Sequence, residues 1–266
     1  PGRVSAVMTE ALARCRAAAD THLPLPAGEG VEVALVGNRP WAAFSRYLGG
    51  YRSRIELNTD YPLTLDRALQ LACHEGYPGH HARTVALDET FARGRGWPEF
   101  TVRLQFSPDT FVSEALASVG VDVAFPGDRR AQVLREALLA PAGLSARSDE
   151  IGRYVRVQRL VDELALQEAA VVRAYLDGRL EFVRAGDALA DLALMANADA
   201  TLKYANEFRT SVLTYTLGAT RARTTLEAGG PDDEARWARY RALSLDPPAR
   251  ALRTLLGARE SSVVSR

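Results

Sequence analysis

The sequence predicts a mainly helical protein with one small antiparallel β-sheet near its N-terminus. Apolar residues recur at helical spacing through most of residues 64–243, a periodicity that is typical of amphipathic helices. Three short segments rich in β-branched and aromatic residues lie between residues 31 and 58, and such segments favour strands. No repeat, low-complexity linker or shift in composition marks a boundary, so residues 1–266 are expected to form a single domain.

The N-terminal elements follow from local patterns. Residues 3–22 are rich in alanine and arginine and carry apolar residues at helical spacing, so they predict a helix, which the stretch LPLPAGEG ends. The next segments are VEVALVG, WAAFSRYLG and YRSRIELNT, and glycine or Asn-Arg-Pro separates them. Together they predict a sheet of antiparallel strands over about residues 31–58.

From residue 64 onward the pattern is helical almost to the end. Thr64 can cap a helix over residues 65–76, a second helical stretch covers 80–92, and the loop RGRGWPEF follows it. The remaining helices are expected at about 108–124, 129–140, 148–177, 181–205, 207–228 and 231–243. The helices of residues 64–124 carry the chemically distinctive residues, and residues 148–243 form a C-terminal helical part.

Composition excludes several classes of protein. The chain is 47% hydrophobic and 25% charged, as in ordinary soluble globular proteins, and its zero formal net charge gives no general attraction to nucleic acid or anionic membranes. No apolar run has the length of a membrane helix and no signal peptide is visible, so we expect a cytoplasmic protein. Cys15 and Cys73 are too few for a disulfide framework, and Cys73 continues an apolar helix pattern, which predicts a buried free thiol.

Three of the four histidines lie within eight residues, in the stretch LACHEGYPGHHARTV at residues 71–85. His74 and Glu75 match the first half of the zinc motif H-E-x-x-H. In that motif two histidines one helical turn apart bind the metal, and the glutamate acts as general base on a metal-bound water. Pro78 occupies the place of the second histidine. A metal site therefore requires a local departure from the helix, and the alternative is a structural turn rich in histidine.

The Pro78-Gly79 pair supplies such a departure. On a regular helix His81 would share a face with His74 but would lie about 10.5 Å further along the axis, which is too far for one metal ion. Proline removes a backbone donor and glycine permits unusual dihedral angles, so the pair should break or bulge the helix. Two extra residues would return His80 to the ligand position, and three would return His81. We favour His80 as the ligand, with His81 as an alternative ligand or as a supporting residue.

A third ligand is expected from the segment TFVSEALASVGVD at residues 110–122. Glu114 is an isolated carboxylate among small and apolar residues, and its burial is best explained by metal binding or by an interhelical ion pair. Asp122 lies two turns later on roughly the same face, where its carboxylate could orient a ligand histidine. The predicted ligand set is therefore His74, His80 and Glu114.

The stretch HEGYPGHH resembles the signature H-E-x-x-P-G-H-H of a bacterial family known as domain of unknown function 885. Its members resemble gluzincin-type zinc metallopeptidases, so the resemblance implies a helical, zincin-like metallopeptidase domain with a small sheet beside the metal helix. The stretch IELNTDYP resembles the family's strand ending in Asn-Thr. The stretch KYANEFRTSVLTYTLG resembles a late family segment, in which Tyr204, Tyr215 and Gly218 match two tyrosines and a final glycine.

The chain departs from the family pattern in three places. The family's Glu-Gly-Trp-Ala is Glu-Ala-Leu-Ala at residues 114–117, its Pro-Gly-Gln is Glu-Phe-Arg at residues 207–209, and its His-His-Leu-Gln is His-His-Ala-Arg at residues 80–83. The resemblance covers roughly residues 50–225. It supports the metal site more strongly than it supports any particular substrate.

Two further residues could act on the substrate. Tyr215 could direct its hydroxyl at an oxyanion that forms beside the metal, or could simply pack between helices. Arg209 could hold an anionic end of the substrate through a bidentate contact, or could pair with Glu207 or Glu168 on the surface.

Asn58 and Thr59 are expected to end an edge strand beside the metal helix. In metallopeptidases such an edge pairs with an extended peptide by β-addition, and ordinary helix capping is the alternative explanation. Tyr204 is assigned to substrate binding through its match to the late family segment.

These observations predict a zinc-dependent, peptidase-like hydrolase in which Glu75 activates a metal-bound water for attack on an amide carbonyl of a peptide or small-molecule substrate. One alternative is a non-peptidase enzyme that uses iron or manganese on a small biosynthetic intermediate, because two histidines and a carboxylate also suit non-haem iron. Another is a non-catalytic binding module. The sequence contains no glycine-rich phosphate loop after a strand and no G-x-S-x-G elbow, so nucleotide binding and serine hydrolase chemistry have no support.

Overall fold

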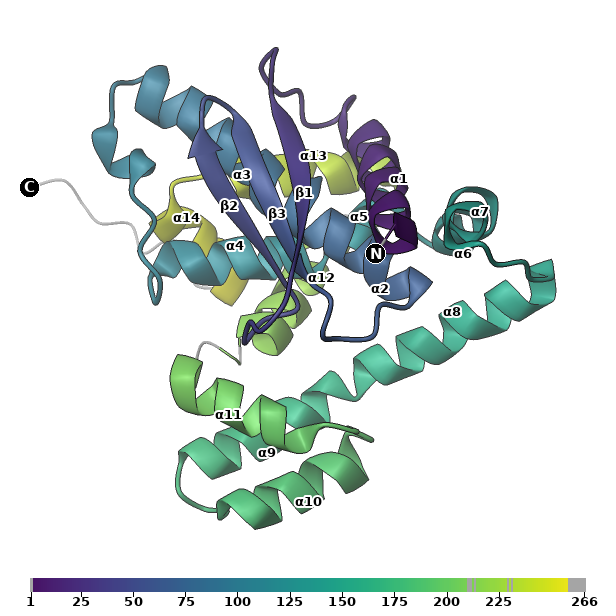
Figure 1. The fold of residues 1–266 in the computed structure, drawn as a ribbon. Helices are drawn as coiled ribbons and strands as arrows, with labels where there is room; N and C mark the ends of the chain where they lie inside the picture. Colours follow the sequence, from purple (N-terminus) through teal and green to yellow (C-terminus); the bar gives the residue numbers. More distant parts are fainter. Residues whose placement is uncertain (1, 210–211, 213, 229, 231, 258–266) are drawn as a thin grey trace, which may run out of the picture.

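Helices make up most of the molecule, and a three-stranded sheet lies against them near the N-terminus (Figure 1). The structure is a computed structural model, and it describes residues 2–209, 212, 214–228, 230 and 232–257. The mainly helical fold with one small sheet agrees with the sequence prediction. None of the helices in these ranges is both long and apolar enough to span a membrane.

The sheet is mixed, with strand order β1-β3-β2. Its strands are β1 (Gly30–Val36), β2 (Ala43–Gly49) and β3 (Arg52–Asn58). A tight turn joins β2 to β3, which pair antiparallel, whereas β1 pairs with β3 in parallel register. The prediction of a purely antiparallel sheet is therefore wrong for β1.

The connection between β1 and β2 explains this topology. Residues 37–42 carry the chain across the end of β3, because Val36 pairs with Asn58 on one side and Ala43 pairs with Leu57 on the other. The two outer strands are therefore kept apart, and β3 occupies the centre and runs in the direction of β1. The prediction that Asn58 ends an edge strand is wrong, since β3 has a partner on both sides.

The helices follow the predicted order, with several interruptions. They are α1 (Gly2–Ala19), α2 (Leu65–Leu71), α3 (His80–Leu87), α4 (Pro108–Ser118), α5 (Gly120–Ala124), α6 (Arg129–Val133), α7 (Leu139–Ala142), α8 (Ser148–Glu163), α9 (Ala165–Leu176), α10 (Phe182–Leu192), α11 (Ala198–Phe208), α12 (Ala219–Glu227), α13 (Asp233–Leu245) and α14 (Pro248–Leu256). Short π turns are η1 (Ala72–Gly76), η2 (Asp88–Arg93), η4 (Leu134–Leu138) and η6 (Thr214–Gly218), and η3 (Pro98–Thr101) is a 3₁₀ turn. Thr64 caps α2 as predicted, since its side chain accepts a hydrogen bond from the Arg67 amide.

Two apolar clusters hold these elements together. The main cluster joins α1, the sheet, α2, α4 and the C-terminal helices α12–α14, and it includes Met8, Ile55, Leu69, Leu116 and Tyr240. The smaller cluster lies within α9–α11 and includes Val172, Leu189 and Leu202. The long helix α8 leads from the main body to this second group of helices (Figure 1). Residues 148–243 thus divide between two cores.

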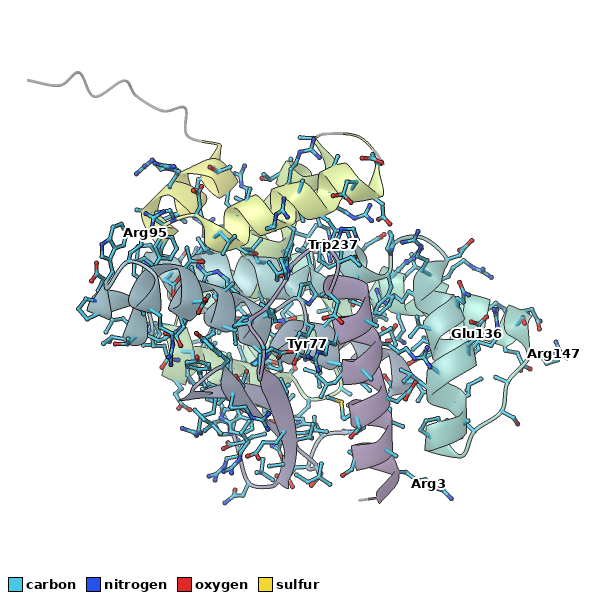
Figure 2. All side chains as sticks on the ribbon, turned by 90° about the horizontal axis from the view of Figure 1, so that it is seen from above. Arg3, Tyr77, Arg95, Glu136, Arg147 and Trp237 are labelled. Atoms are coloured by element: carbon cyan, nitrogen blue, oxygen red, sulfur yellow. A yellow bond between two sulfur atoms is a disulfide. The ribbon has the colours of Figure 1, made fainter. Side chains whose placement is uncertain are left out.

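A disulfide joins Cys15 of α1 to Cys73 of η1, with the two Cα atoms 5.6 Å apart. Figure 2 shows it as a yellow bond beside α1. Cys73 is fully buried as predicted, but the prediction of a free thiol is wrong. The reason is a contact distant in sequence: α1 packs directly on α2 and η1, and this packing brings the two sulfurs together.

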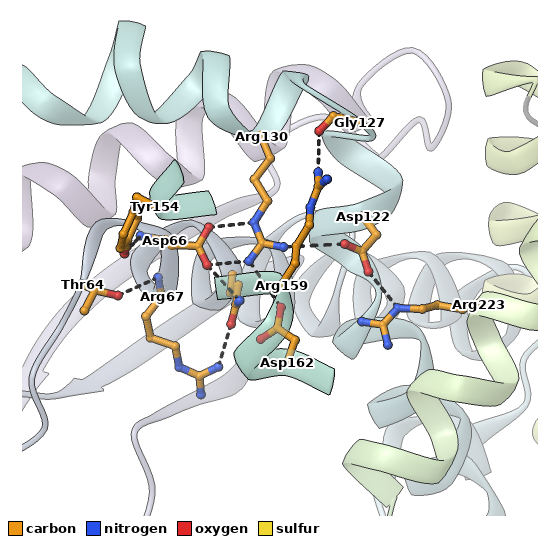
Figure 3. A network of polar contacts seen from close by, with 11 residues as sticks. Thr64, Asp66, Arg67, Asp122, Gly127, Arg130, Tyr154, Arg159, Asp162 and Arg223 are labelled. Atoms are coloured by element: carbon orange, nitrogen blue, oxygen red, sulfur yellow. Dashed lines mark hydrogen bonds and ion pairs between the residues drawn. The ribbon is translucent and has the colours of Figure 1, made fainter. Parts of the chain in front are cut away.

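A buried ion pair anchors the start of α2. Arg130 Nε and Nη2 donate to the two carboxylate oxygens of Asp66 at 2.7 and 2.5 Å, and both side chains are almost fully buried. Figure 3 shows how Asp122 and Asp162 flank the same guanidinium, with oxygens 3.8 and 3.7 Å from its nitrogens. The pair therefore ties α2 to α6, and its neighbours extend the connection to α5 and α8.

Replacing Arg130 by methionine should destabilise the fold strongly. The Arg130→Met variant leaves the Asp66 carboxylate buried without its cation, which costs about 3–5 kcal/mol. Denaturant unfolding followed by circular dichroism measures the loss. The control is Arg147→Met, which removes an exposed pair with Asp149 at 3.0 Å and should cost no more than about 1 kcal/mol. Equal losses in the two variants would show that the buried pair has no special weight.

Candidate metal centre

The helix that carries the histidines is interrupted between His74 and His80. After α2 the chain forms the π turn η1, Tyr77 is extended with φ −123° and ψ 125°, and the Tyr77–Pro78 peptide bond is cis. Helix α3 then begins at His80. The predicted departure from α geometry is therefore present at the Pro78-Gly79 pair.

Gly79 permits a close approach of the two helical segments. Its amide donates to the Cys73 carbonyl at 3.0 Å, and a Cβ atom at this position would overlap the His74 carbonyl oxygen. This contact folds the start of α3 back onto η1. As a result the rings of His74 and His80 lie 4.7 Å apart and almost perpendicular, at 87°.

The third member of the group comes from α4. Glu114 Oε2 lies 3.3 Å from His74 Nε2, and Glu114 Oε1 lies 3.4 Å from His80 Nε2. The three potential ligand atoms lie within 4.8 Å of one another, and all three side chains keep a small solvent-exposed fraction, between 16% and 18%. The structure thus brings together the predicted ligands His74, His80 and Glu114 in a group that could hold a metal ion.

The electrostatics of Glu114 fit a bound cation. Its Oε2 atom is buried without a hydrogen-bond partner among the described residues. Burial raises the pKa of the Glu114 carboxyl. The contacts with His80 and His74 lower this pKa by more than burial raises it, so the carboxyl stays ionised. A buried carboxylate with an unsatisfied oxygen is costly without a cation nearby, and a metal ion would satisfy it.

Ser113 supports His80 from the side opposite Glu114. Its Oγ atom lies 3.0 Å from His80 Nδ1, which leaves Nε2 directed at the group. Sequence reasoning missed Ser113, although its position directly before Glu114 was a usable signal.

Asp122 was expected to orient a histidine, but it accepts a hydrogen bond from Arg223 at 3.0 Å. The helix breaks at Val119, between α4 and α5, so Asp122 no longer follows the face of Glu114.

His81 points away from the group into a buried polar network. Its Nδ1 lies 2.7 Å from Ser53 Oγ and its Nε2 lies 2.8 Å from Glu29 Oε2. The Tyr77 hydroxyl donates to the same Glu29 oxygen at 2.6 Å, and Arg16 Nη2 lies 2.5 Å from the other oxygen. Both ring nitrogens of His81 are occupied, so His81 connects α3 to the sheet and α1 and does not belong to the ligand group.

Tyr240, a buried residue from the C-terminal part of the chain, holds the interrupted segment at Pro78. The Tyr240 hydroxyl of α13 lies 3.1 Å from the Pro78 carbonyl oxygen and 3.3 Å from the Leu116 carbonyl oxygen. It donates a hydrogen bond shared by these two acceptors. It therefore joins the chain around Pro78 to α4, which carries Glu114. The sequence contained no local signal for this role, because the contact spans 162 residues.

Glu75 lies on the same π turn as His74 and is largely buried, with 5% of its surface exposed. Its negative charge acts on the neighbouring Tyr215. Burial is the largest cause that raises the pKa of Tyr215, the charge of Glu114 comes next, and Glu75 adds to it. Tyr215 therefore stays protonated and can donate a hydrogen bond.

Two tyrosines reach the group from the C-terminal part. The Tyr215 ring of η6 lies 6.3 Å from the His74 ring, and its hydroxyl is 3.3 Å from the Tyr204 hydroxyl of α11. Turn η6 packs tightly on α4, where a Cβ atom at Gly218 would lie 3.0 Å from Ala115 Cβ. This close contact holds Gly218, three residues after Tyr215, against Ala115, which follows Glu114 in the chain.

The other predicted substrate residues lie differently. The Asn58 side chain donates to the carbonyl oxygens of Arg39 and Trp41 at 2.9 and 3.1 Å, and so holds the connection between β1 and β2. Arg209 is exposed at the end of α11 and forms no ion pair with any described residue, Glu207 and Glu168 included.

No family model matches the chain, and neither the curated proteins nor the solved structures contain a significant match to it. The resemblance to the family described above therefore rests on the short motifs alone and stays a prediction. The geometry of the histidines, Glu114 and their neighbours carries the functional argument.

Metal binding should distinguish the two adjacent histidines. We expect His74→Ala and His80→Ala to abolish zinc binding, and His81→Ala to weaken it by about 10–100-fold, because His81 acts only through its support of α3. Calorimetric titration of zinc into each variant measures the effect. His22→Ala is the control, since His22 stacks on Trp237 and should keep full affinity. Normal zinc binding by His80→Ala, together with loss in His81→Ala, would reverse the assignment.

The close approach at Gly79 gives a second prediction. Gly79→Ala forces the added methyl group against the His74 carbonyl, so we expect a loss of about 1–3 kcal/mol in unfolding free energy and a loss of zinc affinity. Gly152→Ala is the matched control in α8, where the added Cβ meets only Arg156 Nη1 at 3.6 Å. That variant should gain about 0.5–1 kcal/mol. Unchanged zinc affinity in Gly79→Ala would show that the break tolerates a side chain.

Proposed function

We propose that this protein is a zinc-dependent hydrolase that cleaves peptide or other amide bonds. The observation that carries the proposal is the convergence of His74, His80 and Glu114, together with the buried Glu75 that follows His74 in the chain. Two imidazoles and one carboxylate form a ligand set that catalytic zinc uses, with a fourth position left for water or substrate. Zinc bound there would polarise a carbonyl group and acidify a water molecule.

The side chains around the group suit the remaining steps. Glu75, which follows His74 in the chain, would accept the proton of the attacking water and return it to the leaving amine. Tyr215 keeps its proton and has 39% of its surface exposed, so its hydroxyl can donate to the carbonyl oxygen as negative charge develops there. Ser113 holds the His80 ring in place through Nδ1.

The same ligand set also suits non-haem iron, with manganese as a further candidate. Glu75 favours hydrolysis over these alternatives, because a carboxylate next to a ligand histidine serves as a general base. Metal analysis of protein purified without added metal distinguishes the zinc hydrolase from the iron or manganese enzyme. Redox-active iron with oxygen consumption would favour the non-peptidase enzyme.

Glu75→Gln should separate catalysis from metal binding. The variant keeps the shape of the side chain but removes the base, so we expect normal zinc content and a loss of hydrolysis of about 10²–10⁴-fold. Zinc content by mass spectrometry and hydrolysis of a panel of fluorogenic peptides and amides measure the two properties. Glu136→Gln is the control, because Glu136 is an exposed residue that pairs with Arg135. Full activity in Glu75→Gln, or a protein that binds no zinc, would refute the proposal.

A further inference from the structure

A recess of about 280 Å³ lies between the end of the sheet and the first turns of α2. Apolar side chains form most of its wall, namely Leu57, Tyr61, Pro62, Leu63 and Leu71. The one ionised side chain on its wall is Arg67. The recess is therefore a largely apolar hollow with one cation in its wall.

Arg67 lacks an anionic partner in this setting. Its Nη1 donates to Gln70 Oε1 at 3.2 Å, and among the described residues it forms no other side-chain hydrogen bond and no ion pair. The nearest acidic neighbour in the chain, Asp66, gives both carboxylate oxygens to Arg130. Figure 3 shows the Arg67 guanidinium pointing away from that buried pair.

Arg67 lies in a concave part of the protein surface. The residue is exposed to solvent, yet burial by the surrounding protein is the largest cause that lowers the pKa of its guanidinium. A side chain within a hollow that opens to solvent is both reached by water and surrounded by protein. The negative charge of Glu75, the residue after His74, raises this pKa, as do those of Asp162 and Asp66.

Helix geometry relates Arg67 to the ligands. Leu71 follows Arg67 by four residues, so the two share one face of α2, and His74 lies three residues further along the chain on η1. Seven residues separate Arg67 from His74, which corresponds to about 10 Å along the axis. An extended peptide covers about 3.3–3.6 Å per residue, so about three residues span this distance.

We propose that Arg67 is a specificity-determining residue that binds a carboxylate of the substrate about three residues from the scissile amide, while the recess accepts a neighbouring apolar side chain. The inference rests on the proposed function, since it takes the metal group as the reacting end. Arginine offers a planar pair of donors that matches a carboxylate. The carboxylate can come from the C-terminus of a short peptide or from an acidic side chain.

The test measures binding rather than turnover. Three tetrapeptide-length hydroxamates serve as probes, because the hydroxamate chelates the metal without being cleaved. They share an apolar side chain and end in a free carboxylate, in a carboxamide, or in a carboxamide preceded by aspartate. Calorimetry of the zinc-loaded protein gives each affinity, and zinc content is measured on the same samples.

We expect the wild-type protein to bind at least one carboxylate probe about 10–100-fold more tightly than the neutral probe. The free-carboxylate and aspartate probes then identify the source of the charge. Arg67→Gln should reduce the preference to within about twofold, and Arg67→Lys should keep an intermediate preference because it retains the charge without the planar fork. Arg250→Gln is the control, since Arg250 lies on α14 with 60% of its side chain exposed.

Two outcomes would overturn the inference. Equal binding of all three probes by the zinc-loaded wild-type protein would show that no carboxylate is recognised. A preference that survives in Arg67→Gln would assign the recognition to another residue. Both outcomes leave the proposed function intact, because that function fails on zinc content or on the Glu75→Gln comparison instead.

Discussion

Two histidines six residues apart can serve one metal ion only if the helix between them is interrupted, and the rest of the site depends on this constraint. The interruption occurs where Gly79 rests on the His74 carbonyl, a position at which a side chain would not fit. It restores His80 to the neighbourhood of His74 and simultaneously turns His81 to the opposite side. One local break thus assigns two adjacent histidines to different roles.

The surrounding structure holds this break from several directions. The His81–Glu29–Tyr77 contacts fix it to the sheet side, and Tyr240 fixes the Pro78 carbonyl to α4. A non-helical segment inside a core leaves backbone groups that need partners, and these buried polar contacts supply some of them. The polar network therefore supports the candidate metal centre, although its members are not among His74, His80 and Glu114.

The sequence predicted the centre of the site better than its surroundings. His74, His80 and Glu114 could be named because the spacing of metal ligands and the break at Pro78-Gly79 are local properties, and an isolated carboxylate in an apolar helix is visible in the sequence. Partners that come from distant segments could not be named. The direction of β1, the bond between Cys15 and Cys73, and the hydroxyl of Tyr240 all depend on packing between elements far apart in the chain. The predicted role of Asp122 was wrong for a related reason. The one-residue break at Val119 changes the direction of the side chains that follow it, so Asp122 leaves the face of Glu114.

The bond between Cys15 and Cys73 closes a covalent ring of chain that contains the whole β-sheet and the start of the metal helix. Such a ring restricts the unfolded ensemble, and for a sequence separation of 58 residues the chain-entropy estimate is about 4 kcal/mol in favour of the folded state. Reduction of the bond removes that contribution from the segment that bears His74. The stability of the segment that carries His74, a candidate ligand, is thereby linked to the thiol–disulfide balance of the compartment in which the protein works.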